Sequence, residues 1–165
     1  MKYWSTLFLF SSTLFLSAQK NDSPKLIVGV VVDQMCYEYL YRYQDKFGKD
    51  GFNLFMEKGT NVRNTLYNYV PTYTGPGHAS IYTGTTPENH GIVGNEWFER
   101  ETNKVVNCVD DLRQQTIGSE SDYGQRSPKN LKTFTVTDQL KLTYPDAKVI
   151  SMSIKDRSAI LPGGH

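Results

Sequence analysis

Charged side chains stand at the ends of two apolar segments of the sequence. Asp33 ends an apolar run over residues 25–32, and Lys155 and Arg157 follow a second run over residues 148–154. Runs of this kind are typical of strands inside a parallel sheet. Because ligands bind outside the carboxyl ends of such strands, we expect one carboxylate and two cations at the same sheet edge. A metal ion and an anionic substrate suit that combination.

A third group of polar residues lies in a segment that is dense in glycine, proline, threonine and histidine, residues 71–95. Thr74 stands where we expect a short helix to begin, at about residues 75–82, and Asn95 ends the segment. A threonine hydroxyl is a weak nucleophile until a metal ion or a base lowers its pKa. The N-terminus of a helix offers backbone N–H groups to an anion. By itself, Thr74 is better interpreted as a helix cap, and Asn95 could be a turn residue.

Four separated motifs, in this order, resemble the alkaline phosphatase superfamily. They are Val32-Asp33-Gln34-Met35, the segment around Thr74, Asn95, and Ser153-Ile154-Lys155-Asp156-Arg157. The resemblance is to the secreted alkaline phosphatases that use a threonine nucleophile, and to the related type I phosphodiesterase/nucleotide pyrophosphatases. It covers residues 26–165 and corresponds only to the N-terminal portion of the family's catalytic domain.

The resemblance implies a zinc-dependent phosphate monoester hydrolase that acts on a small phosphate ester. Thr74 would be the catalytic nucleophile, forming a phosphothreonine that water hydrolyses, and Asp33 and Thr74 would be ligands of one of two Zn²⁺ ions. Asn95, Lys155 and Arg157 would bind the substrate. Two cations favour the dianionic phosphate of a monoester, Arg157 through its planar fork and Lys155 as a point charge.

Three alternatives to a phosphomonoesterase remain open. A phosphodiesterase/nucleotide pyrophosphatase of the same superfamily would share the nucleophile and the metal site. A sulfatase-like or phosphoethanolamine-transferring enzyme would keep the fold, although Thr74 argues against a sulfatase, which typically needs cysteine or serine there. A non-catalytic secreted binding module would account for an incomplete set of metal ligands.

This chain supplies too few of the metal ligands that the resemblance implies. Two zinc ions need roughly three protein ligands each, and none of the three histidines is a good candidate. The family supplies its other ligands from sequence beyond the position of His165. We therefore expect an N-terminal portion of a longer enzyme that has little or no phosphatase activity alone.

Alternating strands and helices must position these residues. We expect helices over about residues 37–47, 52–57, 75–82 and 135–143, strands over 25–32, 61–69 and 148–154, and a hairpin formed by 96–99 and 105–108. This order predicts an α/β fold with a largely parallel sheet. With the resemblance, it becomes an alkaline-phosphatase-like sandwich with a largely parallel central sheet, incomplete in this chain.

The first residues of the sequence bear on where the protein is located. Residues 1–18 are typical of a signal peptide, with a positive start, an apolar run and small residues before Gln19; a single membrane anchor is the rival interpretation. Residues 19–165 would then be a periplasmic or secreted bacterial domain without a stable membrane span. Export would permit a disulfide between Cys36 and Cys108, although two free thiols are equally consistent.

With 18 basic and 17 acidic residues, a strongly basic nucleic-acid binder is disfavoured.

Overall fold

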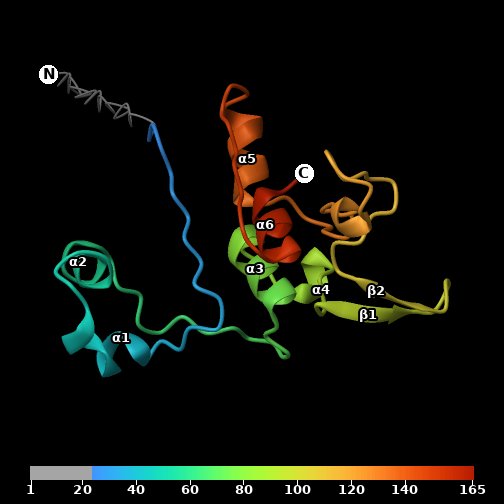
Figure 1. Cartoon of the computed structure of the whole chain (residues 1–165). Coiled ribbons are helices and arrows are strands. Elements are labelled where there is room, and N and C mark those ends of the chain that lie inside the picture. The colour runs from blue at the N-terminus through green and yellow to red at the C-terminus, as the bar shows by residue number, and fades with distance from the viewer. Residues whose placement is uncertain (1–23) are drawn as a thin grey trace, which may run out of the picture. The chain divides into compact units, whose positions relative to one another are not determined.

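The computed structural model describes residues 24–165 (Figure 1). The chain divides into two compact units, residues 1–32 and residues 33–165. In the first unit, the described residues 24–32 form no helix or strand, and their apolar side chains are exposed. The expected signal peptide, residues 1–18, lies outside the described residues.

The regular structure of the second unit is mainly helical, with one hairpin. In chain order its elements are α1 (Tyr39–Arg42), the 3₁₀ turn η1 (Gln44–Lys46), α2 (Phe52–Lys58), α3 (Thr74–Thr83), α4 (Pro87–His90), β1 (Glu96–Glu99), β2 (Lys104–Asn107), the 3₁₀ turn η2 (Asp122–Gly124), α5 (Val136–Thr143) and α6 (Asp156–Gly163). The helices expected over residues 52–57, 75–82 and 135–143 and the hairpin are therefore present, whereas the helix expected over residues 37–47 is replaced by the short α1 and η1. Sequence patterns did not indicate α4, η2 or α6.

Helix α3 is the central element of this unit. It packs against α6, α4 and α5, and Figure 1 shows α3 and α6 side by side. Pro76 lies in its first turn, where a backbone N–H has no partner within the helix. Gly84 follows the last residue of the helix in the left-handed conformation (φ 69°), which glycine adopts without steric cost.

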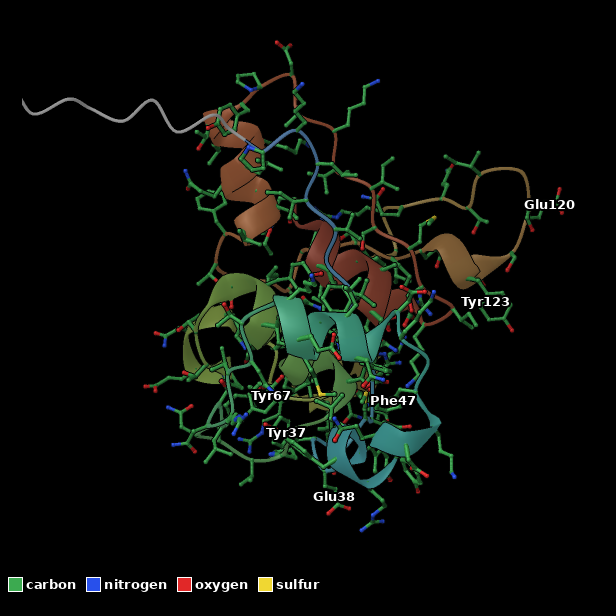
Figure 2. The ribbon with its side chains drawn as sticks, turned by 90° about the vertical axis from the view of Figure 1, so that its left-hand side faces the viewer. Tyr37, Glu38, Phe47, Tyr67, Glu120 and Tyr123 are labelled. Carbon is green, nitrogen blue, oxygen red and sulfur yellow. The ribbon has the colours of Figure 1, made fainter. Side chains whose placement is uncertain are left out.

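A small apolar core lies beneath α3 and joins it to segments that follow in the sequence. Its buried residues are Ala79, Ile92, Cys108, Val109, Leu131 and Leu161, with Trp97 and Ile160 partly buried against them. The hairpin contributes through antiparallel pairing of β1 with β2, from Glu96 opposite Asn107 to Glu99 opposite Lys104. Side chains of the loop around η2 point away from the ribbon, among them Tyr123 (Figure 2). The core thus holds α3 against the hairpin and α6.

The expected parallel sheet is not formed within residues 24–165. The three segments expected to be its strands, residues 25–32, 61–69 and 148–154, have no strand assignment, and the hairpin is the only sheet among the described residues. Their apolar side chains remain exposed: Val30 is 77% exposed and Met152 is 86% exposed. A strand is stabilised by hydrogen bonds to a neighbouring strand, and these segments have none here. The apolar pattern predicted burial that this portion of the fold does not supply.

Candidate active site at the N-termini of α3 and α6

Thr74 and Lys155 both donate a hydrogen bond to the same carboxylate oxygen of Asp33. The Thr74 hydroxyl donates to Asp33 Oδ2 at 3.3 Å, and Lys155 Nζ donates to the same atom at 2.5 Å. Thr74 is the first residue of α3, and Lys155 is the cap residue before α6. Residues far apart in the sequence therefore meet where two helices begin. A cation shared by Asp33 and Thr74 requires their oxygens to be close together, and the observed distance meets that requirement.

The Asp33 carboxyl is held in its charged form. The hydrogen bond from Lys155 lowers the pKa of Asp33 most; partial burial opposes this, but the charge of Lys155 and the Thr74 hydroxyl lower the pKa further. Asp33 is therefore ionised at neutral pH and carries the negative charge that a metal ligand needs. The Thr74 hydroxyl consequently faces a carboxylate that accepts its proton in a hydrogen bond.

Asn95 is tied to the first turn of α3 through Gly75. The backbone N–H of Gly75 donates to Asn95 Oδ1 at 2.8 Å. A Cβ at position 75 would lie only 3.1 Å from the Gly94 carbonyl oxygen and 3.2 Å from Cys108 Sγ, so a larger residue would force these neighbours to move by a few tenths of an ångström. The same contact fixes the Asn95 amide, and within residues 24–165 its Nδ2 donates to no protein atom. Asn95 therefore keeps two N–H donors for an anion next to Thr74.

Arg157 reaches Asn95 from the first turn of α6. Its Nη1 donates to the Asn95 carbonyl oxygen at 3.5 Å, and its Nε donates to Asp156 Oδ1 at 3.3 Å. Its side chain is 20% exposed. Asp33, Thr74 and Lys155 thus form one hydrogen-bonded group, Asn95 and Arg157 form a second, and Gly75 links the two through its neighbour Thr74. The structure brings together all five site residues expected from the sequence.

The described residues contain part of a metal site at most. No group of three or more His, Cys, Asp or Glu side chains within residues 24–165 is arranged to hold a metal ion. Asp33 and Thr74 supply two oxygen donors, which fit zinc as part of a larger ligand set. His78 instead donates from Nδ1 to the Thr74 carbonyl oxygen at 2.8 Å, and His165 contacts Asp138.

Both cysteines are free thiols. Cys36 is exposed and Cys108 is buried, so they form no disulfide. Burial raises the pKa of the Cys108 thiol to about 11, which keeps it protonated at neutral pH. Cys108 therefore serves as an apolar residue beneath Gly75, while the thiolate needed for chemistry is absent.

Sequence patterns missed two residues that contact the site. Asp156 lies between Lys155 and Arg157, and its position in that motif was the available signal. Arg126 donates from Nε to Asp156 Oδ2 at 3.0 Å, although it lies 30 residues earlier in a polar stretch that gives no local indication of such a role.

Comparisons with known proteins identify a family and several relatives. The family described as type I phosphodiesterase / nucleotide pyrophosphatase matches residues 27–145. The chain is 52% identical over 143 residues to alkaline phosphatase PhoV of Synechococcus elongatus, covering 86% of this chain and 26% of that protein. It is 49% identical over 155 residues to alkaline phosphatase PafA of Elizabethkingia meningoseptica, covering 91% and 28%. It is also 48% identical over 157 residues to a protein named calcium-transporting ATPase from Myroides odoratus, covering 94% and 29%.

A solved structure shows the same relationship in three dimensions. The crystal structure of wild-type alkaline phosphatase PafA matches with a TM-score of 0.84 at 49% identity, over 86% of this chain and 28% of that one. A PafA variant with four substitutions matches with a TM-score of 0.80 at 45% identity, over 82% and 26%. The chain thus spans between a quarter and a third of the length of these relatives and has the corresponding part of the PafA fold. Among the described helices, none has the length and apolarity to cross a bilayer.

Proposed function

Because the chain belongs to the type I phosphodiesterase / nucleotide pyrophosphatase family, we propose that the full protein is a phosphate monoester hydrolase of the alkaline phosphatase type with Thr74 as its nucleophile. One observation carries this proposal. The Thr74 hydroxyl lies at the N-terminus of α3 beside the ionised Asp33, with Lys155 on the same carboxylate oxygen. A hydroxyl, an anion-binding helix end and a cation are the groups that phosphoryl transfer to threonine requires.

The reaction would proceed in two displacements at phosphorus. In the first, Thr74 Oγ1 forms a bond to phosphorus and gives up its proton while the ester P–O bond breaks, so that an alcohol leaves after taking up a proton. In the second, water attacks the phosphothreonine, inorganic phosphate leaves, and Thr74 regains its proton. Asn95, Lys155 and Arg157 would hold the phosphoryl oxygens through both steps by charge-assisted hydrogen bonds.

The residues present fit zinc as part of its ligand set. Asp33 and Thr74 would hold one ion through their oxygens. Zinc, when bound, lowers the pKa of a coordinated hydroxyl and polarises the phosphoryl group. We propose two ions in the full enzyme, with further ligands from outside residues 24–165. Lys155 pairs with the Asp33 carboxylate and neutralises its charge.

The relatives support the assignment of residues. The PafA variant carries substitutions of a threonine, an asparagine, a lysine and an arginine. Thr74, Asn95, Lys155 and Arg157 are the same types in the same order, with the same spacing within the Thr–Asn pair and within the Lys–Arg pair.

For location, we propose a periplasmic or secreted protein whose residues 1–18 are removed as a signal peptide.

A phosphodiesterase is the second candidate, because the matching family takes its description from diester hydrolysis. A monoester carries one more anionic oxygen than a diester, and Lys155 and Arg157 supply two cations at one site. Rates on p-nitrophenyl phosphate and bis-p-nitrophenyl phosphate separate the two. We expect the larger kcat/KM for the monoester; a larger value for the diester would select the second candidate.

The nucleophile is tested with Thr74→Ala in the full protein expressed from its gene. We expect kcat to fall by at least about 1,000-fold, because the covalent route needs the hydroxyl. Acid quenching during turnover followed by mass spectrometry should find a phosphate on the Thr74 peptide only in the unsubstituted enzyme. Thr83→Ala, at the opposite end of α3, is the matched control and should keep both properties. A Thr74→Ala enzyme with full turnover would refute the assignment.

A further inference from the structure

A row of alternating charges leads from Asp110, just after the hairpin, to Arg157. Arg126 Nη1 lies 3.0 Å from Asp110 Oδ1, and Arg126 Nε donates to Asp156 Oδ2 at 3.0 Å. The other oxygen of Asp156 accepts from Arg157 Nε at 3.3 Å and from the Arg157 backbone N–H at 2.6 Å. Arg157 Nη1 then reaches the Asn95 carbonyl oxygen. The row therefore consists of Asp110, Arg126, Asp156 and Arg157. It ends beside Asn95, which is bonded to the first turn of α3.

The backbone holds Arg126 at the centre of this row. Asp110 and Arg126 are partners in an isolated antiparallel bridge, which places their side chains next to each other. Arg126 Nη1 also donates to the Gln125 carbonyl oxygen at 2.9 Å. The four charged side chains are only 20% to 31% exposed, so solvent and salt screen their interactions less than at an open surface. These contacts therefore hold Arg126 in place, and Arg126 in turn holds the Asp156 carboxylate through its hydrogen bond.

Sharing of the Asp156 carboxylate leaves Arg157 with capacity for a ligand. Arg126 occupies Oδ2 and Arg157 contacts only Oδ1, so Arg157 and Asp156 form no bidentate pair. Within residues 24–165, Arg157 Nη2 donates to no protein atom. Without Arg126, both oxygens of Asp156 would be open to Arg157, and a bidentate carboxylate–guanidinium pair is the stronger arrangement. That pair would withdraw the guanidinium from a bound anion.

We propose that Arg126 and Asp156 are positioning residues that keep one edge of the Arg157 guanidinium free for the dianionic phosphate of a monoester. This inference rests on the proposed function and extends it to two residues that touch neither substrate nor nucleophile. Arg126 acts by occupying Asp156, and Asp110 acts by holding Arg126. The row thereby sets the preference for a monoester over a diester.

The kinetic test uses Arg126→Gln in the full protein expressed from its gene. Loss of the hydrogen-bond partners that orient metal ligands costs about 10-fold or more in activity, and we expect an effect at the lower end of that range for Arg126. We expect kcat/KM for p-nitrophenyl phosphate to fall about 10-fold, while that for bis-p-nitrophenyl phosphate changes less than about 2-fold, because a diester lacks the extra charged oxygen. Asp110→Asn should change the ratio in the same direction by less. Arg126→Lys, which restores one charge, should recover part of it.

Arg113→Gln is the matched control. Arg113 also pairs with an aspartate, Asp111, but its side chain is 76% exposed and does not contact the row. Its substitution should leave the monoester-to-diester ratio unchanged. Equal losses on both substrates in Arg126→Gln would overturn the inference, because a general structural defect does not discriminate between them.

A crystal structure of Arg126→Gln decides the inference independently of activity. We expect Asp156 to contact Arg157 through both carboxylate oxygens and the Arg157 contact to the Asn95 carbonyl to be lost. An Arg157 side chain that keeps its original contacts would refute the positioning role. If the unsubstituted enzyme hydrolyses no monoester, the proposed function fails, whereas the movement of Arg157 still tests the coupling of these side chains. If Arg126→Gln does not fold, Asp110→Asn, which removes the partner that holds Arg126, serves for both measurements, with a smaller expected change.

Discussion

At the level of single side chains, Asn95 combines two tasks in one amide. Its Oδ1 accepts the Gly75 backbone N–H at 2.8 Å and thereby ties the start of α3 to the start of β1. The other end of the amide keeps its N–H donors for the proposed phosphoryl group. An aspartate is nearly isosteric, keeps the acceptor and carries a charge that the N-terminus of a helix favours.

Asn95→Asp should therefore separate stability from substrate binding. We expect the melting temperature to stay within a few degrees of the unsubstituted protein, because the contact with Gly75 persists. The inhibition constant of inorganic phosphate should rise at least about 10-fold, because a donor is replaced by a negative charge facing an anion. Asn95→Ala is the comparison and should lose both properties. Unchanged inhibition by phosphate in Asn95→Asp would show that Asn95 has only the structural task.

At the level of the helices, a buried row of hydrogen bonds joins α4 to α3. His90 is fully buried, and its Nδ1 accepts the Ile92 backbone N–H at 3.1 Å, so its Nε2 donates to Ser80 Oγ at 3.0 Å. Ser80 and Tyr69 hydroxyls lie 2.7 Å apart, and the Tyr69 hydroxyl donates to the Pro76 carbonyl oxygen at 3.1 Å. Every polar atom in this row has a partner only when His90 is neutral. Burial accordingly lowers the pKa of His90.

The lowered pKa of His90 predicts a loss of stability in mild acid. The unfolded chain, with a histidine pKa of about 6.5, takes up a proton before the folded chain does. Stability is therefore complete above about pH 6.5 and decreases as the pH falls toward the folded pKa. Thermal melts from pH 8 to pH 5 should show a larger decrease for the unsubstituted protein than for His90→Gln.

Asn89→Gln, at an exposed neighbouring position on α4, is the control for this measurement. It should reproduce the pH dependence of the unsubstituted protein. If His90→Gln has the same pH dependence as the unsubstituted protein, His90 does not link α3 and α4 in the way described.

For the chain as a whole, the main feature is apolar surface that the described residues leave uncovered. In the first unit, Leu26 is 78% exposed and Val30 is 77% exposed. In the second unit, Ile150 is 81% exposed, and Met152 and Ile154 are still more exposed. Extended apolar segments with unpaired backbone groups promote association between chains.

A polypeptide of residues 19–165 should consequently self-associate. We expect Ile154→Lys to raise the fraction that sediments as monomer, because a charge interrupts an extended apolar segment. Ile117→Lys is the matched control: Ile117 is fully exposed but lies in a polar loop, and its substitution should have a much smaller effect. If both variants behave alike, net charge rather than the apolar segment governs association.

Local patterns were sufficient for several elements and indicated the candidate site residues. Helices α2, α3 and α5 and the hairpin were predicted because periodicity, glycine ends and turn residues act over a few neighbouring positions. Asp33, Thr74, Asn95, Lys155 and Arg157 were predicted because each belongs to a short motif whose order resembles a known family. Their side chains lie together at the N-termini of α3 and α6, and not at the expected sheet edge; their catalytic roles are proposals.

Interactions between distant segments could not be read from those patterns. The apolar runs at residues 25–32 and 148–154 predicted strands, yet a strand exists only where another segment supplies its hydrogen bonds, and none does here. Arg126 had no recognisable signal, since its importance comes from Asp110 and Asp156, which folding brings to it from different elements. Residue type thus indicated which chemistry was available. Packing of α3 against α6 decided which other side chains support that chemistry. The reason is that electrostatic coupling depends on distance in space and not on distance along the chain.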